Sequence, residues 1–378
     1  SYTLTLWEMG PRETTSLFSC KDRIIPSGGF LAGEGGLAAA GPGGHLIRRR
    51  LSGPDEIPEI QKCPDRLAGK LNRVITSPDG ELIILSCHAP GEKECEIQVR
   101  SCAPGMPLRL RDKQAGDKVL YDAFFSRDSR LAALTFRKCS GIYDRKTNRI
   151  RWFDRRNQPD LFAETDRPGD FHYWTDAAFL PGNTHLLVVN GKSPAKGIDL
   201  EGNIAFPCTP SGDRGPWPKY VAVSPRGPWA LTASDEGPIR LWRIHSPTRA
   251  RLHRVIHDDN LATLKDIGFC PDGKNLYAIG RAVRSEGAVY SRGFVRFWSF
   301  QGEKTWEDTL DQAVIRFTYS RDGRFFLAGT VQRCRLWSAQ DRRHLYDMPF
   351  TGLGKLDNYT IARKAIHFSP GGDWIMAK

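Results

Sequence analysis

The chain has 378 residues, with 55 lysines and arginines against 43 aspartates and glutamates, which gives a net charge of +12 at pH 7. No run of about 18 apolar residues occurs, so we expect no membrane-spanning helix. The 37 glycines and 25 prolines are spread evenly, as in a protein with many turns rather than a disordered tail.

The first residues already have the pattern of a strand. Residues 3–8, Thr-Leu-Thr-Leu-Trp-Glu, alternate polar and apolar side chains. No charged and then apolar leader precedes them, so we expect a chain that has been processed or cut from a longer polypeptide. A weak copy of the repeat described next occupies Phe30–Leu51, with a turn at Gly33–Gly36 and a third strand at His45–Leu51.

A turn of the type Ser-Pro-Asp-Gly recurs along the rest of the chain. Successive copies begin 49, 54, 44, 46, 50 and 49 residues apart, a period typical of propeller blades rather than of helical solenoids. The copies are Ser77–Gly80, Ser126–Ser129, Leu180–Asn183, Ser224–Gly227, Cys270–Gly273, Ser320–Gly323 and Ser369–Gly372.

Each turn separates two predicted strands. The five residues before it have an apolar third residue, which predicts a strand with one packed face. These first strands are residues 72–76, 121–125, 175–179, 219–223, 265–269, 315–319 and 364–368. The apolar runs of the second strands are 82–85, 131–134, 186–189, 229–231, 276–279, 325–328 and 374–376, and third strands that end in tryptophan are 239–242, 295–298 and 334–337. Because long helical periodicity is missing, we predict an all-β protein.

The two ends of the chain complement each other. Ala365–Lys378 supplies only the first two strands of a unit, and residues 1–8 have the pattern of a lone third strand. Joining them completes one blade and closes a ring without a free edge. We therefore predict a single β-propeller domain over residues 1–378, with eight blades, or seven as the alternative. The predicted blades are residues 10–55, 66–112, 117–156, 173–208, 218–258, 263–309, 312–352, and 362–378 together with 1–9.

One stretch carries a family resemblance. Val221–Gly227 followed by Leu231–Trp242 resembles a blade of the WD-repeat β-propeller family, and weaker copies cover essentially the whole chain. The resemblance implies a divergent member of that family or a related propeller. The Gly-His pair that precedes the first strand in that family is absent, and Asp235 is the one clear loop aspartate before a third strand. The hydrogen-bonded network that these residues form in the family is therefore expected to be incomplete.

The cysteines predict a reducing environment. Nine is an odd number for a protein held by disulfides, and no C-x-x-C pair occurs. Most of them stand alone beside strand residues, so we expect reduced core thiols and a cytoplasmic location. Cys87, Cys95 and Cys102 lie closer together, and a local disulfide there is left open.

No pattern of catalytic residues stands out. Nucleophile elbow, P-loop, dinucleotide glycine fingerprint and H-E-x-x-H motifs are all missing. His257–Asp259 and Asp170–His172 are the nearest to an acid–imidazole constellation, and both are expected to be solvated turns. Asp144–Trp152 resembles the docking motif of eight-bladed quinoprotein dehydrogenases, with Asn148 and Arg149 in place of Gly and Lys, which implies a quinone enzyme as a minor alternative. We predict a protein that is not an enzyme and holds no cofactor or metal.

The expected binding surface lies where the first strands begin. In a propeller these residues gather around one mouth of the central channel, and loops after the second strands join them. Cations outnumber anions at these positions, so we expect a protein or acidic peptide partner anchored by arginine and aromatic side chains. A catalytic domain in the same or an associated chain is a further expected partner. The predicted binding residues are Arg73, Tyr121, Trp174, Lys219, Tyr220, Lys265, Arg281, Arg316, Arg333 and Lys364.

Nucleic acid or an acidic lipid is the alternative partner. Basic clusters occur at Arg48–Arg50, Arg145–Lys146, Arg149–Arg151 and Arg155–Arg156. Strand alternation would send the middle arginine of the first cluster to the opposite face, so this cluster is not one patch. Long polar connectors at residues 155–173 and 281–293 are further places where function is expected.

Overall fold

The computed structural model shows an all-β fold. Within the described residues the chain forms six or more four-stranded antiparallel sheets, and the single helical element is the 3-10 turn η1 (Pro159–Leu161). No helix in this part of the chain is long and apolar enough to cross a membrane. The described residues are 2–9, 14–22, 28–31, 36–40, 46–50, 59–61, 70–88, 94–103, 107–115, 120–136, 139–154, 156–161, 174–208, 216–258, 261–282, 292–330, 332–349, 366–369 and 371–377.

The chain divides into two compact units. The first consists of Ser1–Ala123, Arg145–Ile150 and Thr318–Lys378, and the second of Phe124–Asp144 and Arg151–Phe317. The prediction of a single domain with the blade limits given above stays a prediction.

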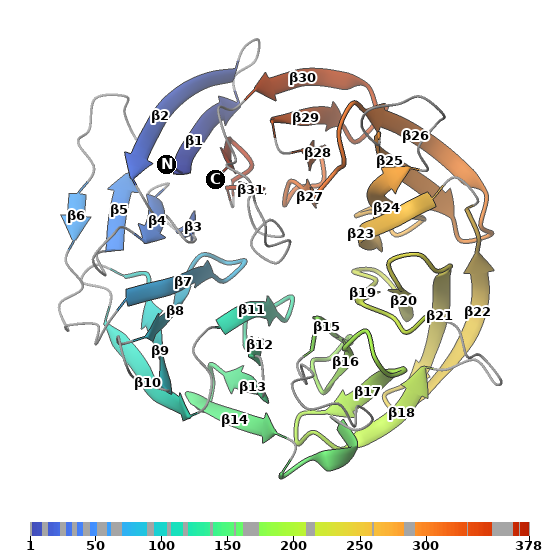
Figure 1. Cartoon of the computed structure of the whole chain (residues 1–378), viewed down its shortest axis with the longest axis horizontal. Coiled ribbons are helices and arrows are strands. Elements are labelled where there is room, and N and C mark those ends of the chain that lie inside the picture. Colours follow the sequence, from blue (N-terminus) through green and yellow to red (C-terminus); the bar gives the residue numbers. More distant parts are fainter. Residues whose placement is uncertain are drawn as a thin grey trace. The chain divides into compact units, whose positions relative to one another are not determined.

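In the first unit, one sheet is built from both ends of the chain. Its order is β2-β1-β32-β31, so the N-terminal strand lies between its own neighbour in sequence and a C-terminal strand (Figure 1). Leu6 is opposite Met376, and Glu8 is opposite Trp374. The predicted pairing of the two chain ends is therefore confirmed. The strands are β1 (Tyr2–Met9), β2 (Thr14–Asp22), β31 (Ile366–Phe368) and β32 (Trp374–Ala377).

Two more sheets of this unit follow the N-terminal part of the chain. The weak repeat copy is confirmed as the sheet β3-β4-β5-β6, in which β5 is the predicted third strand. Its strands are β3 (Gly28–Phe30), β4 (Gly36–Ala40), β5 (Leu46–Arg50) and β6 (Glu59–Gln61). The next sheet consists of β7 (Lys70–Thr76), β8 (Leu82–His88), β9 (Glu94–Ser101) and β10 (Leu108–Ala115).

Two sheets contain residues at the limits of the units. One consists of β11 (Leu120–Phe125), β12 (Leu131–Phe136), β13 (Cys139–Asp144) and β14 (Arg149–Asp154). The other consists of β27 (Arg316–Tyr319), β28 (Phe325–Gly329), β29 (Arg333–Ser338) and β30 (His344–Pro349). Both run in sequence order from first to fourth strand.

Three consecutive sheets lie wholly within the second unit. The first comprises β15 (Asp176–Phe179), β16 (His185–Val189), β17 (Ala195–Asp199) and β18 (Ile204–Cys208). The second comprises β19 (Tyr220–Val223), β20 (Trp229–Ala233), β21 (Ile239–Ser246) and β22 (Arg249–Ile256). The third comprises β23 (Leu261–Phe269), β24 (Asn275–Ala282), β25 (Gly293–Ser299) and β26 (Lys304–Leu310).

The recurring turn has a local chemical cause. Ser126 opens one copy, and its hydroxyl accepts a hydrogen bond from the Leu131 amide (2.8 Å) and donates one to Asp128 Oδ1 (2.6 Å). In copies such as Ser77–Gly80 and Ser320–Gly323 the fourth residue lies in the left-handed region, with φ of 72° at Gly80 and 73° at Gly323. Glycine adopts this conformation without steric penalty, which explains why the turn signature located the strands correctly.

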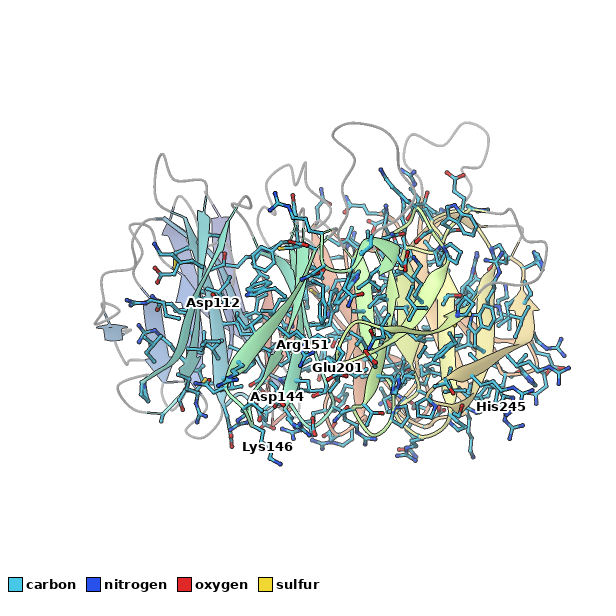
Figure 2. The ribbon with its side chains drawn as sticks, turned by 90° about the horizontal axis from the view of Figure 1, so that it is seen from below. Asp112, Asp144, Lys146, Arg151, Glu201 and His245 are labelled. Carbon is cyan, nitrogen blue, oxygen red and sulfur yellow. The ribbon has the colours of Figure 1, made fainter. Side chains whose placement is uncertain are left out.

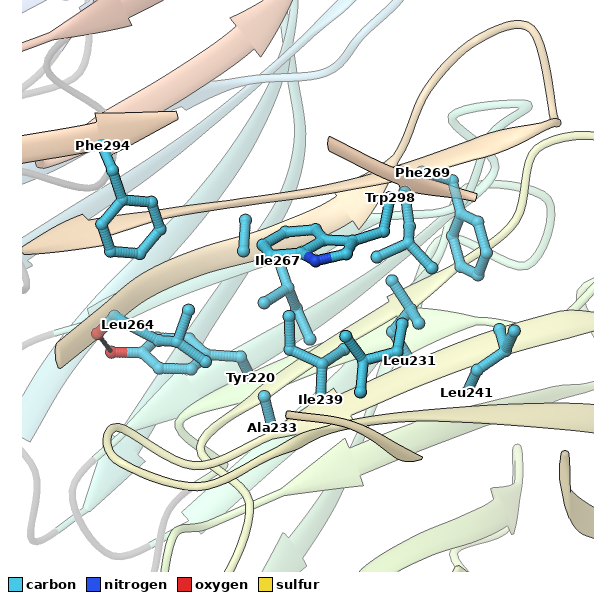
Figure 3. Packing of buried hydrophobic residues seen from close by; sticks show 13 residues of the cluster. Tyr220, Leu231, Ala233, Ile239, Leu241, Leu264, Ile267, Phe269, Phe294 and Trp298 are labelled. Atoms are coloured by element: carbon cyan, nitrogen blue, oxygen red, sulfur yellow. Dashed lines mark hydrogen bonds between the residues drawn. The ribbon is translucent and has the colours of Figure 1, made fainter. Parts of the chain in front are cut away.

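The core of the second unit lies between its sheets. Apolar side chains of β19–β21 pack against those of β23–β25 (Figure 3). Trp298, near the end of a predicted third strand, is 3% exposed. Both faces of these inner strands are covered, whereas the fourth strands β22 and β26 are partly exposed and highly charged. The cluster comprises Tyr220, Leu231, Ala233, Ile239, Leu241, Ile256, Leu264, Ile267, Phe269, Leu276, Ala278, Phe294 and Trp298.

Candidate binding surface at the start of the first strands

In the second unit, polar contacts connect the starts of neighbouring first strands. Asp176 Oδ2 accepts a hydrogen bond from the Val221 amide of the next first strand at 3.2 Å. The Tyr220 hydroxyl lies 3.0 Å from the Leu264 carbonyl oxygen, again one sheet further on (Figure 3). Because every such contact crosses from one sheet to the next, the strand starts are held in fixed relative positions.

An ion pair connects the next two first strands in the same way. Arg316 Nη1 at the start of β27 lies 3.9 Å from Asp266 Oδ2 in β23, and both side chains are about one-quarter exposed (23% and 22%). In these four first strands the second predicted residue (Asp176, Tyr220, Asp266 or Arg316) is therefore the one that contacts a neighbouring sheet. We call the starts of β15, β19, β23 and β27, with the β20–β21 turn and the end of β24, the first-strand surface.

Asp235 links several parts of this surface. Its carboxylate forms an ion pair with Lys219 and lies 2.8 Å from the Tyr220 hydroxyl. Its carbonyl oxygen accepts a hydrogen bond from the Leu264 amide at 2.7 Å. The Lys219 side chain remains 45% exposed, so its ammonium group is both positioned by Asp235 and accessible to a partner.

A β-bulge shapes the neighbouring strand. The register of β23 with β24 shifts between Leu264 and Asp266, which makes Lys265 the extra residue. A Cβ atom added at Gly280, opposite Leu264, would lie 2.1 Å from the Thr263 carbonyl oxygen. Only glycine therefore permits this close approach of the two strands. The next residue, Arg281, is exposed, and its Nη2 lies 3.3 Å from Thr263 Oγ1.

Trp174, predicted to bind a partner, lies in the core instead. It is 2% exposed and packs at 6.0 Å from the Phe153 ring, measured between centroids. Within the described part of the chain its Nε1 has no hydrogen-bond partner. The sequence pattern could not show this, because an aromatic residue just before a strand fits a core position and a channel mouth equally well.

In the first unit, Arg73 is also buried, with 7% of its surface exposed. Its Nε donates to the Leu120 carbonyl oxygen at 3.3 Å, which connects β7 with β11. Burial lowers the pKa of the Arg73 guanidinium, and the nearby Asp122 carboxylate partly opposes this change. This geometry gives Arg73 a structural role at the strand start.

The remaining predicted binding residues have different surroundings. Tyr121 and Lys265 are half-buried. Arg333 Nη1 lies 3.7 Å from Asp347 Oδ2, with both side chains one-third exposed (33% each). Lys364 lies outside the described residues. The structure therefore brings together Lys219, Tyr220, Lys265, Arg281 and Arg316, while their acidic partners Asp235 and Asp266 were not among the predicted site residues.

The described residues of the other sequence motifs form ion pairs and ring contacts. Asp258 Oδ2 lies 2.7 Å from Arg296 Nη1, so it is part of an ion pair, while Asp259 and Asp170–His172 lie outside the described residues. In the quinoprotein-like motif, Asp144 Oδ2 pairs with Arg130 Nη2 at 3.0 Å, and Trp152 packs edge-on against Phe136. Among the described residues, no three histidine, cysteine or acidic side chains are grouped in a way that would hold a metal ion.

The seven cysteines whose side chains the structure describes are buried. The Cys95 sulfur lies 3.0 Å from Ser86 Oγ, and burial raises the pKa of the Cys208 thiol to about 12. Such a thiol stays protonated and unreactive at neutral pH. Most of the two long connectors (162–173 and 283–291) lies outside the described residues. The buried cysteines with described surroundings are Cys87, Cys95, Cys102, Cys139, Cys208, Cys270 and Cys334.

Comparison with known proteins identifies no family for the chain. No protein-family model matches the chain, and no curated protein matches it at a significant level.

Proposed function

We propose that the protein is a non-catalytic β-propeller that binds a protein or an acidic peptide through the first-strand surface. In this proposal the sheets are eight blades of one ring over residues 1–378, and the sheet shared by both chain ends closes it. The shared sheet supports closure, because its order places β31, β32, β1 and β2 as first to fourth strand. Other sheets, such as β19-β20-β21-β22, have the same order.

A divergent WD-repeat origin is part of the proposal. The Trp242 indole donates from Nε1 to Thr232 Oγ1 at 2.9 Å, which ties the third strand to the second. Asp235, the loop aspartate of the same sheet, contacts Lys219 and Tyr220. These contacts are those expected of a blade in which lysine and tyrosine take the place of the missing histidine.

The observation that carries the proposed function is a rigid polar framework with accessible cations. Contacts through Asp176, Tyr220 and Asp266 hold the strand starts, while the side chains of Lys219 and Arg281 remain exposed. A partner that binds such a prearranged surface loses little conformational entropy on the protein side. Carboxylates are the natural complement to these cations, which favours an acidic segment.

A peptide-display selection tests the proposal. Short random peptides selected on the purified chain are expected to be rich in Asp and Glu. The triple variant Lys219→Glu, Lys265→Glu, Arg281→Glu should bind a selected peptide at least about tenfold more weakly. Arg73 and Arg316 are left unchanged because they are largely buried, and reversing their charge would threaten folding.

A matched variant controls for net charge. Arg226→Glu, Lys274→Glu, Arg324→Glu changes three exposed turn residues by the same amount, and its affinity should stay within about twofold of the parent. Selected peptides without acidic enrichment, or equal losses in both variants, would reject the first-strand surface as the binding site.

A further inference from the structure

The outer strand β22 carries only basic charges. From Ile239 to His257 the sequence contains five arginines, three histidines and no acidic residue. Figure 2 shows His245 projecting from the ribbon at the edge of this region. We call the six exposed side chains of β21 and β22 the β22 basic surface: Arg243, His245, Arg249, Arg251, His253 and Arg254.

The strand register concentrates these charges. Arg243 and Arg251 are directly opposite each other in the β21–β22 pair, an arrangement of like charges that destabilises a sheet. The register shifts between Leu241 and Trp242, which makes His253 the extra residue of a bulge. Because of this bulge, His253 and its neighbour Arg254 are both exposed, although they are consecutive.

Two other outer strands carry an acid opposite an arginine of the third strand. Arg296 of β25 is opposite Glu307 of β26, and their side chains form an ion pair at 2.8 Å. Arg335 of β29 is opposite Asp347 of β30 and pairs with it at 2.8 Å. Charged residues protect an exposed strand edge from aggregation whatever their sign, so edge protection alone does not explain an outer strand without acids.

The basic surface also lacks neutralising partners. Within the described part of the chain, none of its six side chains forms an ion pair with an acid. The resulting local field of one sign opposes folding and attracts anions. A surface that keeps such repulsion is best explained by a polyanionic ligand that relieves it.

The chemistry of the surface favours nucleic acid. All its permanent charges are arginines, which bind phosphate through two parallel hydrogen bonds and stack on bases. An aromatic group adjoins them: the Arg243 guanidinium carbon lies 5.7 Å from the Trp229 ring centroid, and the His253 ring lies 4.9 Å from it. Arginines interleaved with aromatic rings are typical of surfaces that bind single strands.

A membrane surface fits less well. Peripheral membrane attachment needs exposed apolar side chains beside the cations. Among the described residues the exposed large apolar side chains are Leu108 and Ile204, and neither belongs to β21 or β22.

We propose that the β22 basic surface binds the phosphate backbone of single-stranded nucleic acid. The site lies on strands other than those of the first-strand surface and does not depend on the function proposed for it. Binding is expected to be insensitive to base sequence, because backbone contacts carry little sequence information.

A fluorescently labelled single-stranded oligouridylate is the probe for the test. The chain should bind it with an affinity that falls steeply as salt rises. In the variant Arg243→Gln, Arg249→Gln, Arg251→Gln, affinity should fall at least about tenfold, and the slope of log affinity against log salt should become shallower by about two, since each phosphate contact contributes about 0.7.

A charge-matched variant and a lipid probe make the test decisive. Arg226→Gln, Arg321→Gln, Arg343→Gln removes the same charge from exposed turn residues and should leave affinity within about twofold. The melting temperature of the variant with Arg243, Arg249 and Arg251 replaced by glutamine should be no lower than that of the parent chain, because the repulsion between Arg243 and Arg251 is removed. Equal losses in both variants, no binding by the parent chain, or binding only to phosphatidylserine vesicles would overturn the proposal.

Discussion

Arg296 is a buried charged residue that two acids neutralise. Its side chain is 4% exposed and is bound by two acids, Asp258 and Glu307, while its guanidinium carbon lies 4.4 Å from the Phe294 ring centroid. Replacing one member of a buried ion pair leaves the others desolvated without compensation. Arg296→Met should therefore lower the free energy of unfolding by about 3 kcal/mol, measured by urea denaturation.

Arg324→Met provides the matched comparison. Arg324 also pairs with an aspartate, Asp322, but its side chain is 65% exposed, and exposed pairs contribute about 0.5 kcal/mol. If both substitutions changed stability equally, the distinction between buried and exposed pairs in this protein would be wrong.

Asp347 provides a prediction about pH. Its burial would raise the pKa, but hydrogen bonding and attraction from Arg335, with a contribution from His344, outweigh this and hold the pKa below its ordinary value of 3.8. A lowered pKa in the folded state means that the carboxylate stabilises the fold above the unfolded pKa and loses this effect as pH falls through the folded one.

The variant Asp347→Asn should therefore melt at a lower temperature than the parent at neutral pH. The difference should shrink as pH falls below about 4, as followed by circular dichroism. Asp160→Asn, at an exposed aspartate, is the control and should melt with the parent. A difference that persists unchanged at acid pH would contradict the assignment of the stabilising charge to Asp347.

At the scale of the element, the β-bulge at Lys265 depends on Gly280. A Cβ atom there would lie 2.1 Å from a backbone oxygen of β23, whereas one at Gly227 would lie 3.1 Å from the Trp229 side chain. A backbone atom cannot move away from a new Cβ atom as easily as a side-chain atom can. Gly280→Ala should therefore lower the free energy of unfolding by about 3 kcal/mol and Gly227→Ala by less than about 1 kcal/mol, measured by thermal denaturation. Similar losses in both would show that the bulge tolerates a side chain.

The elements predicted best from sequence are those whose position is set by residues close to them in the chain. In several copies a serine hydroxyl or a left-handed fourth residue fixes the turn within a few residues, as at Ser126 and Gly80, so the first and second strands were located correctly. The fourth strands were not located, because strands such as β22 (Arg249–Ile256) and β26 (Lys304–Leu310) lack an apolar run. Their place becomes visible only through pairing with a third strand.

The candidate surface was predicted only in part, for a different reason. Alternation indicates two faces of a strand but not which of them is covered, and the inner strands here are covered on both. Arg73 and Trp174 therefore proved to be buried. Lys219 lies at the start of a first strand, but its partner Asp235 is sixteen residues away in sequence and contacts it only through the fold of one sheet. The arginines of β22 are interrupted by other residues, so they do not form a consecutive basic run in the sequence.

At the scale of the whole molecule, the sheet that joins both chain ends has a special position. In the other sheets, turns connect successive strands and help to set their register. No turn connects β1 with β32, so only hydrogen bonding and the pattern of side chains determine that Leu6 faces Met376. The proposed ring closure therefore depends on one strand pair that can be tested directly.

A disulfide across this pair is the test. Opposite residues of antiparallel strands have Cα atoms about 5 Å apart, which suits a disulfide. The double variant Leu6→Cys, Met376→Cys should therefore form an intramolecular bond on mild oxidation, identified by peptide mapping. The oxidised form should be more stable than the reduced form by up to about 5 kcal/mol, since the bond closes a very long loop. In the control Tyr2→Cys, Met376→Cys the first cysteine lies four residues further along β1, about 13 Å away, and should not form the bond. Equal bond formation in both variants, or none in the first, would show that the two ends do not pair in this register, and the closed ring would then have to be abandoned.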